Sequence, residues 1–237
     1  LLTFLWTKER IRPILEKKSS LKSDLKDLGV NKPWWILLGA SVMVLVFNSL
    51  RDGAAVFYFK YYVEGADLWS FSIMDASLTL ITIYLVLGQA FNIVGILCVP
   101  ALTRAIGKKL TFLSAMAVAT VLSIIFYFLP KDMVVAILSM QILISFCAGI
   151  VSPLMWSMYA DIADYSEWKT GRRATGLIFS SSSMSQKLGW TIGGSLSGWL
   201  LFYFGFEANV VQTETALTGI CLMMSVLPAC ATLFLSL

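Results

Sequence analysis

Six long apolar segments divide the chain, and short runs rich in charged residues separate them. A helix needs about 20 consecutive apolar residues to cross a bilayer. The pattern therefore predicts an all-α membrane protein with six transmembrane helices, near residues 34–61, 77–102, 109–130, 132–158, 174–204 and 215–237. The first and fifth segments exceed the bilayer thickness, so we expect those helices to tilt or to extend beyond it.

The chain before the first span differs from the rest. Residues 1–6 are apolar and resemble the end of a helix that has been cut through, so we expect the chain to be a fragment. Between residues 21 and 28, leucines recur at helical spacing among charged residues, which indicates a short amphipathic helix. The sequence thus predicts two regions: the end of a preceding helix and a cytoplasmic linker over 1–33, then a six-helix transmembrane bundle over 34–237.

Composition supports the membrane class, since 58% of the residues are hydrophobic and 14% are charged, against about 45–50% and 25% in soluble domains. Basic residues cluster before the first span and after the second and fourth, whereas the opposite connections contain Lys131 alone. The positive-inside rule then places both termini in the cytoplasm. We expect a multi-pass protein of the plasma membrane, namely the inner membrane of a bacterium. The net charge of +4 reflects this topology, so no nucleic-acid partner is indicated.

The residues used for metal and acid–base chemistry are sparse. The chain has no histidine, and its four cysteines form no Cys-x-x-Cys pair, so neither a metal site, a disulfide framework nor a bound cofactor is indicated. No nucleophile and base stand out as a pair, and we expect that the protein is not an enzyme.

Lys187 lies about halfway along the fifth span, next to Gln186. A lysine at the centre of a membrane helix costs about 2.5–3.5 kcal/mol, so it faces a polar cavity or a partner. We interpret Lys187 as a cavity residue that donates to a substrate hydroxyl or anion; the alternative is a structural ion pair. Two overlapping glycine pairs follow, Gly189 with Gly193 and Gly194 with Gly198, a spacing that is typical of close helix packing.

The first span carries a second polar group, formed by Asn48, Arg51 and Asp52 about midway along the segment. Such residues face a bundle interior or a water-filled cavity. We therefore count them as candidates for substrate binding or ion coupling. The alternative is that Arg51 and Asp52 form structural pairs with neighbouring helices.

Aromatic residues near these polar groups indicate a class of ligand. A sugar ring has an apolar face and hydroxyl edges, so an aromatic platform with a few donors suits it. Trp156, Tyr159, Trp190 and Tyr58 are the candidates for such a platform.

A charged run follows the fourth span. Asp161, Asp164 and Glu167 recur every three residues, so a helical continuation of that span places them along one stripe. Arg173, and Arg104 with the two lysines of its turn, supply the opposite charge. A network of this kind could bias a two-state equilibrium, although the same residues could simply be solvated loop charges.

Two motifs carry a resemblance to a known family. Asp161 begins the run Asp-Ile-Ala-Asp-Tyr-Ser-Glu-Trp-Lys-Thr-Gly-Arg-Arg-Ala-Thr-Gly-Leu, and residues 182–189 read Ser-Ser-Met-Ser-Gln-Lys-Leu-Gly. Together they resemble the loop 10–11 and helix 11 signature of the glycoside–pentoside–hexuronide:cation symporters, the melibiose-permease-like branch of the major facilitator superfamily. The stretch from Arg51 to Val63 resembles helix 7 of that family. The resemblance covers nearly the whole chain, but only as the second half of such a protein.

The resemblance implies the C-terminal half of a twelve-helix bundle, with sugar bound between two six-helix halves and coupled to Na⁺, Li⁺ or H⁺. Lys187 matches the lysine near the cation and sugar sites, and Ser182 and Ser183 fall where the family has polar residues near the sugar. Trp156 is displaced by about one turn from the family's helix 10 tryptophan.

The resemblance further implies that Asp161, Asp164 and Arg173 belong to a cytoplasmic gate, and that most cation-binding carboxylates lie in the first half. We therefore expect the C-terminal half of a cation-coupled sugar or glycoside symporter, which works by alternating access with its N-terminal half. Its partners are then the sugar, the cation, the bilayer and that half. The alternative is a truncated membrane protein that does not transport, or a relic that binds sugar.

Overall fold

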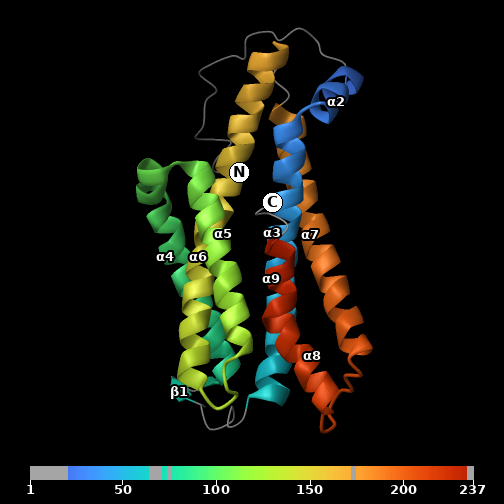
Figure 1. The fold of residues 1–237 in the computed structure, drawn as a ribbon. Coiled ribbons are helices and arrows are strands. Elements are labelled where there is room, and N and C mark those ends of the chain that lie inside the picture. The colour runs from blue at the N-terminus through green and yellow to red at the C-terminus, as the bar shows by residue number, and fades with distance from the viewer. Residues whose placement is uncertain (1–20, 64–70, 74–75, 172–174, 234–237) are drawn as a thin grey trace.

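The computed structural model describes residues 21–63, 71–73, 76–171 and 175–233, and most of them lie in long helices arranged side by side (Figure 1). Arg173 of the expected gate and residues 1–20 lie outside the described residues. In chain order the elements are α2 (Leu21–Gly29), α3 (Lys32–Phe57), the π-helical turn η1 (Tyr58–Tyr62), β1 (Phe71–Ile73), β2 (Ala76–Leu78), α4 (Leu80–Ile106), α5 (Lys108–Tyr127), α6 (Val134–Thr170), α7 (Thr175–Tyr203), α8 (Glu214–Met224) and α9 (Val226–Leu233).

Each of the six apolar segments forms helix, which confirms the predicted helical membrane class. The count of spans differs in one respect. Within the described ranges, five helical stretches are long and apolar enough to cross a membrane by length and composition, and α7 is not among them. With 29 residues α7 is long enough, but its serines, Gln186 and Lys187 make it too polar for that criterion. It still packs along α3 as a full-length member of the bundle.

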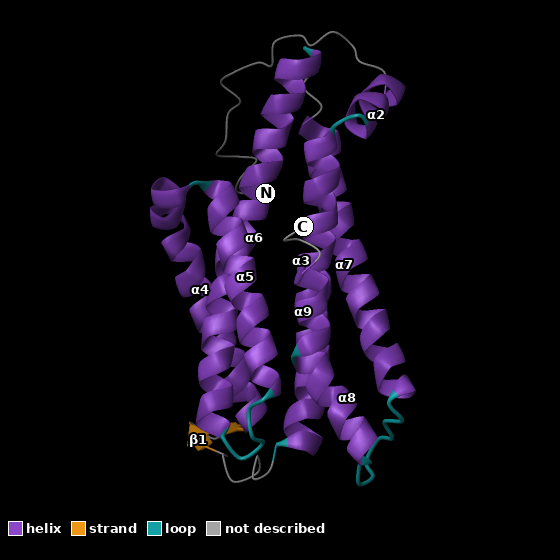
Figure 2. Ribbon diagram, in the orientation of Figure 1, coloured by secondary structure: helices purple, strands orange, loops and turns teal. Residues whose placement is uncertain are grey.

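Two short antiparallel strands, β1 and β2, depart from the all-α prediction (Figure 2). Phe71 pairs with Leu78, and Ile73 with Ala76. Both segments alternate apolar and polar residues, a period of two that favours strands over a helix. For this reason the second span begins at Leu80 rather than at 77. We call this side of the bundle the hairpin end, and the opposite side the α2 end.

The helices form two groups that lie side by side (Figure 1). In one group α5 and α4 pack along α6, and in the other α7, α8 and α9 pack against α3. The groups are joined where α9 packs against α5 and where α3 contacts α6. Apolar clusters fill the interior of the bundle, one of them around Tyr58, Tyr84 and Phe126.

Glycines set how closely α3 and α7 approach, as their spacing predicted. Gly189 lies against Leu45, and Gly193 lies against Ser49. Both contacts advance in the same direction along the two helices, so α3 and α7 run parallel. Gly194 and Gly198, the second pair, face open space and are exposed, so the structure confirms close packing for the first pair only.

The sequence predicts that the fourth span continues as a helix through the charged run, and the structure confirms it. α6 runs without interruption for 37 residues and ends at Thr170, and Gly171, with a positive φ of 67°, caps the last turn. Asp161, Asp164 and Glu167 are exposed along this extension, while Ile162 between them is buried. The charges therefore share a solvent-facing side of a helix.

The short helix α2 lies against this extension. Leu28 is buried in a cluster with Trp34, Ile162 and Ile178, which belong to α3, α6 and α7. Leu25, one turn earlier, is 52% exposed. The amphipathic helix expected in this region thus packs against the protein through Leu28.

The sixth span, expected as one helix over 215–237, is two helices. α8 ends at Met224 and α9 begins at Val226, with Ser225 between them at φ −128° and ψ −87°, outside the helical region. Pro228 lies four residues after Met224 and has no backbone N–H, so the hydrogen bond that would join the two helices there cannot form.

Candidate functional site

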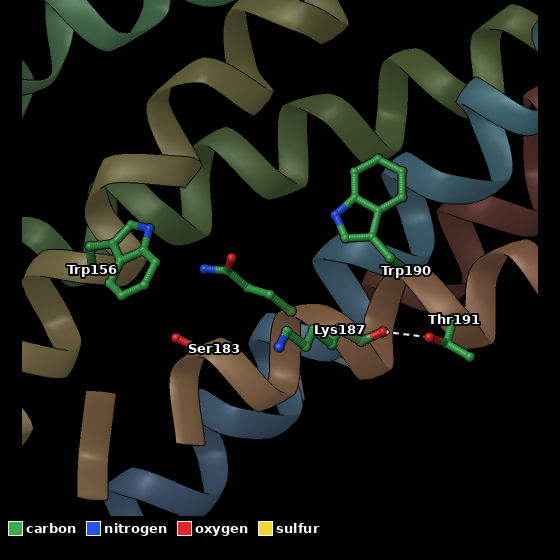
Figure 3. Close-up of a pocket in the computed structure, with 6 residues that line it drawn as sticks. Trp156, Ser183, Lys187, Trp190 and Thr191 are labelled. Carbon is green, nitrogen blue, oxygen red and sulfur yellow. Dashed lines mark hydrogen bonds between the residues drawn. The ribbon is translucent and has the colours of Figure 1, made fainter. Parts of the chain in front are cut away.

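A pocket of about 550 Å³ opens between α6 and α7, and five residues named from the sequence line it. Figure 3 shows Trp156 of α6 across this pocket from Ser183 and Lys187 of α7. The complete lining is Trp156, Ser183, Gln186, Lys187, Trp190 and Thr191.

Helix geometry explains why these α7 residues share the pocket. Ser183, Lys187 and Thr191 are spaced by four, so they lie above one another on one face of the helix. The Thr191 hydroxyl donates to the Lys187 carbonyl at 2.8 Å, and the Ser183 hydroxyl donates to the Phe179 carbonyl at 3.2 Å. Because both hydroxyls donate their hydrogen bonds to the backbone, they can only accept hydrogen bonds from a ligand in the pocket.

The Lys187 side chain is exposed in this pocket. No carboxylate among the described residues lies within ion-pair distance of its ammonium group. The structural ion pair considered above therefore has no partner in the part of the chain that the structure describes. An ammonium offers three donors and no acceptor, so Lys187 can bind a hydroxyl or an anionic oxygen.

Trp156 forms the aromatic wall of the pocket. Its ring stacks on that of Phe179, with centroids 6.1 Å apart and planes 13° apart, and the side chain is 39% exposed. One face of the indole is held by the neighbouring helix. The other parts remain open to a ligand, and the indole N–H can donate.

Ser182 does not join the pocket, contrary to the sequence-based prediction. It is 1% exposed, because it lies about 100° around α7 from Ser183 and turns into the bundle. There Ser185 donates to the Ser182 carbonyl at 2.7 Å. Tyr159 and Tyr58, proposed as platform aromatics, are likewise 1% and 0% exposed and lie in the core.

The polar group on α3 is divided. Arg51 is 4% exposed and lies in the core, where it donates to the Met224 carbonyl, the Tyr84 hydroxyl and the Gln141 side chain. Its guanidinium group is thus removed from the pocket between α6 and α7. The sequence suggested a ligand role because a charge inside a span is costly. In the structure, hydrogen bonds to groups in the core compensate for that cost.

Asn48 and Asp52 do not line the pocket either. Asn48 is half-buried and Asp52 is exposed. Because Leu45 of α3 lies level with Gly189 of α7, Asp52 is about nine residues beyond the level of Lys187, roughly 13 Å along the axis. Asp52 and Lys187 therefore belong to different depths of the bundle.

The charges at the α2 end are partly paired. Lys108, the first residue of α5, donates to both carboxylate oxygens of Asp161 at 2.7 and 2.8 Å. Their side chains are 41% and 54% exposed, so solvent screens the pair and it contributes about 0–1 kcal/mol. Lys108 is one of the basic residues that the sequence predicted as partners of this stripe. Arg104, another of them, is exposed at the last turn of α4. Gly107, with φ 79°, turns the chain so that Lys108 takes the position facing α6.

Of the residues that line the pocket, the sequence named Trp190 as a candidate platform aromatic, and Thr191 was missed. The signal for Thr191 was its spacing of four from Lys187 and eight from Ser183, which helix periodicity places on the same face. Within the described ranges, no group of three potential metal ligands is found, so the pocket offers hydrogen bonds and an aromatic wall.

The sequence profile of the family described as MFS/sugar transport protein matches residues 1–237. The chain belongs to this family. The match agrees with the resemblance to glycoside–pentoside–hexuronide:cation symporters seen in the motifs, and it confirms that the chain belongs among transporters and not among enzymes.

Three relatives illustrate the relationship to the sugar transport family. The isoprimeverose transporter of Lactiplantibacillus pentosus is 33% identical over 222 residues, covering 92% of this chain and 43% of that protein. The glucuronide carrier protein homolog of Escherichia coli K12 is 30% identical over 94% of this chain and 46% of its own length. The inner membrane symporter YicJ of the same organism is 28% identical over 95% and 46%. The chain thus spans less than half the length of these relatives.

Proposed function

We propose that this chain is the C-terminal six-helix half of a cation-coupled sugar or glycoside symporter, and that the pocket between α6 and α7 supplies this half's share of the sugar site. The observation that supports it best is the combination in one open pocket of an aromatic wall, Trp156, with the donors of Gln186 and Lys187. Sugars are recognised by an aromatic surface under the ring and directed donors at its edges.

The two sides of the pocket suit different parts of a glycoside. Trp156 presents a partly exposed aromatic ring to the apolar face of a sugar. Lys187 presents a compact positive charge that binds a hydroxyl, or the carboxylate of an acidic sugar more strongly because both partners are then charged. The names of two relatives, an isoprimeverose transporter and a glucuronide carrier homolog, support this ligand class.

We propose that a second six-helix half completes the site. The relatives are more than twice as long as the stretch that matches this chain. Alternating access requires one half to rock against the other around a site near the middle of the membrane. In this proposal residues 1–33 connect the two halves, and Na⁺, Li⁺ or H⁺ is bound largely by carboxylates of the other half.

The experiment that tests this function is ion-gradient-driven uptake in vesicles that contain the chain within its full coding context. Labelled glycosides, with neutral and acidic sugars compared, should accumulate above their external concentration when a Na⁺, Li⁺ or H⁺ gradient is imposed. Collapse of the gradient should abolish accumulation. Absence of gradient-dependent uptake for every sugar class would contradict a symporter.

We propose further that the α2 end faces the cytoplasm of a bacterial cell, because the basic residues gather there. Cysteines at Val211 and Trp168 test this topology, since these positions are 97% and 81% exposed. Trp168 lies near the end of α6, and Val211 lies in the connection between α7 and α8, at the opposite end of the bundle. After the native cysteines are replaced, a membrane-impermeant maleimide should label Val211→Cys on intact cells. Trp168→Cys should react only after permeabilisation, and the reverse order of labelling would invert the topology.

The stripe of Asp161, Asp164 and Glu167 is proposed to close the cytoplasmic side of the pathway. Asp164→Asn should then raise the reactivity of a cysteine at Ser183 toward reagents added from the α2 end by about two- to fivefold, because exposed charge pairs contribute up to about 1 kcal/mol. Asp132→Asn, an exposed carboxylate at the hairpin end, is the matched control and should have no effect. Equal reactivity in both variants would show that the stripe is ordinary solvated charge.

A further inference from the structure

The break between α8 and α9 leaves a backbone carbonyl without its helical partner. In a continuous helix the carbonyl of Met224 accepts from the amide of residue 228, which here is Pro228. Proline has no N–H, and its ring pushes against the carbonyl four residues before it. In hydrocarbon such a carbonyl has no water to bind, so an unsatisfied one is costly.

Arg51 of α3 occupies the position of the missing donor. Its Nη1 donates to the Met224 carbonyl at 2.5 Å, and its Nη2 donates to Tyr84 at 3.2 Å and to Gln141 at 3.1 Å. One planar guanidinium thus reaches α4, α6 and the break in the sixth span at the same time. Such fixed, diverging donors are a property of arginine and not of lysine.

The surroundings of Arg51 show what the charge does not do. The guanidinium carbon lies 5.8 Å from the Phe47 ring centroid and 5.3 Å from that of Phe126. Among the described residues, no carboxylate lies within ion-pair distance of Arg51. Its hydrogen-bond partners are a carbonyl, a phenol and an amide, and the rings of Phe47 and Phe126 lie beside the guanidinium. Arg51 is therefore placed to complete hydrogen bonds of the core.

We propose that Arg51 is the substitute donor for the carbonyl orphaned by Pro228, and that it locks the break in the sixth span to α3, α4 and α6. The break is then a fixed joint, which moves with the rest of this half. Arg51 thereby acts as a positioning residue for the bundle, a role distinct from the sugar-site residues of the proposed function. This inference does not depend on which substrate is carried.

Restoring the missing amide tests the proposal. Arg51→Met removes the donors, and Pro228→Ala returns an N–H that can reach the Met224 carbonyl. The readout is alkylation of Cys221, which is 3% exposed and lies one turn before Ser225, in membranes that contain the chain in its full coding context. The other cysteines are replaced, so that the rate reports opening of the break.

Arg51→Met should raise the alkylation rate of Cys221 about tenfold, as loss of a charge-assisted hydrogen bond predicts. The double variant Arg51→Met with Pro228→Ala should return most of the way to the parent rate. Pro153 of α6, also inside a helix, provides the matched control, and Arg51→Met with Pro153→Ala should remain as reactive as Arg51→Met alone.

Arg51→Lys is a second variant that keeps the proposal testable if Arg51→Met does not insert into the membrane. Its ammonium can satisfy the Met224 carbonyl or the side-chain acceptors, and so its rate should be intermediate and Pro228→Ala should correct it. The proposal is overturned if Pro228→Ala rescues neither arginine variant, or if Arg51→Met leaves Cys221 as protected as in the parent. The alkylation rate of Cys221 does not depend on sugar uptake, so failure of this proposal can be distinguished from failure of the proposed transport function.

Discussion

Among the glycines that the structure describes, Gly149→Ala is expected to cause the largest loss of stability. A Cβ at position 149 would clash with the carbonyl oxygen, the carbonyl carbon and the Cα of Asn92 on α4. Backbone atoms cannot turn aside as a long side chain can. The two helices would have to separate, and the reciprocal close contact of Gly95 with the α6 backbone at Phe146 would also be lost.

Because α4 and α6 pack along one another over much of their length, this separation cannot stay local. We expect a destabilisation of about 3 kcal/mol, at the upper end for overpacked cores. The measurement is the yield of monodisperse protein in mild detergent together with its midpoint of thermal unfolding. Gly149→Ala should lower both.

Gly194→Ala provides the control for this prediction. Gly194 is helical and exposed, and a Cβ there meets nothing within 4 Å. Alanine should be neutral or slightly stabilising at that position, since glycine costs about 0.5–1 kcal/mol relative to alanine within a helix. Equal stability of the two variants would show that the close approach of α4 and α6 does not limit the fold.

In the full-length symporter proposed above, Lys187→Met is expected to reduce concentrative uptake strongly while leaving the protein in the membrane. The substitution removes a charge that costs about 2.5–3.5 kcal/mol near the centre of a helix, so insertion should be unchanged or improved. Uptake should fall by about tenfold or more, because coupling free energies of 1–3 kcal/mol are lost with the group that carries them. Lys187→Arg should restore little, since a planar guanidinium does not replace a compact ammonium.

Lys32→Met, the same substitution at an exposed lysine at the start of α3, controls for loss of a positive charge. It should transport normally. Gradient-driven uptake in vesicles is measured beside the amount of each variant in the membrane. Accumulation at the parent level by Lys187→Met would remove Lys187 from the site and leave the pocket without its charged donor.

The sequence predicted the spans and much of the pocket because both depend on local spacing. Apolar length marks a membrane helix whatever surrounds it. The resemblance placed Ser183 near the sugar, and helical periodicity explains why it shares a face with Lys187. The same periodicity separates Ser182 from Ser183 by about 100°. Motifs at Asp161 and Lys187 pointed to the sugar transport family that the profile match then showed.

The orientation of charged and small residues around each helix was decided by the tertiary structure. Lipid and protein core are equally apolar, so hydrophobicity does not tell which face of a membrane helix is buried. Arg51 therefore looked like a site residue until its partners at Met224, Tyr84 and Gln141 were known. Likewise, only the neighbouring helix distinguishes the packed Gly189 and its pair from the open second pair.

The sequence by itself determined that this chain forms long membrane helices with a lysine at mid-depth and a charged helical extension, because these features follow from composition and period along one segment. The tertiary structure decided which of its polar groups meet: Lys187 with Trp156 across a pocket, and Arg51 with the carbonyl that Pro228 leaves unpaired. The physical reason is that a donor and its acceptor lie on helices far apart in the chain, and only packing sets the distance between them.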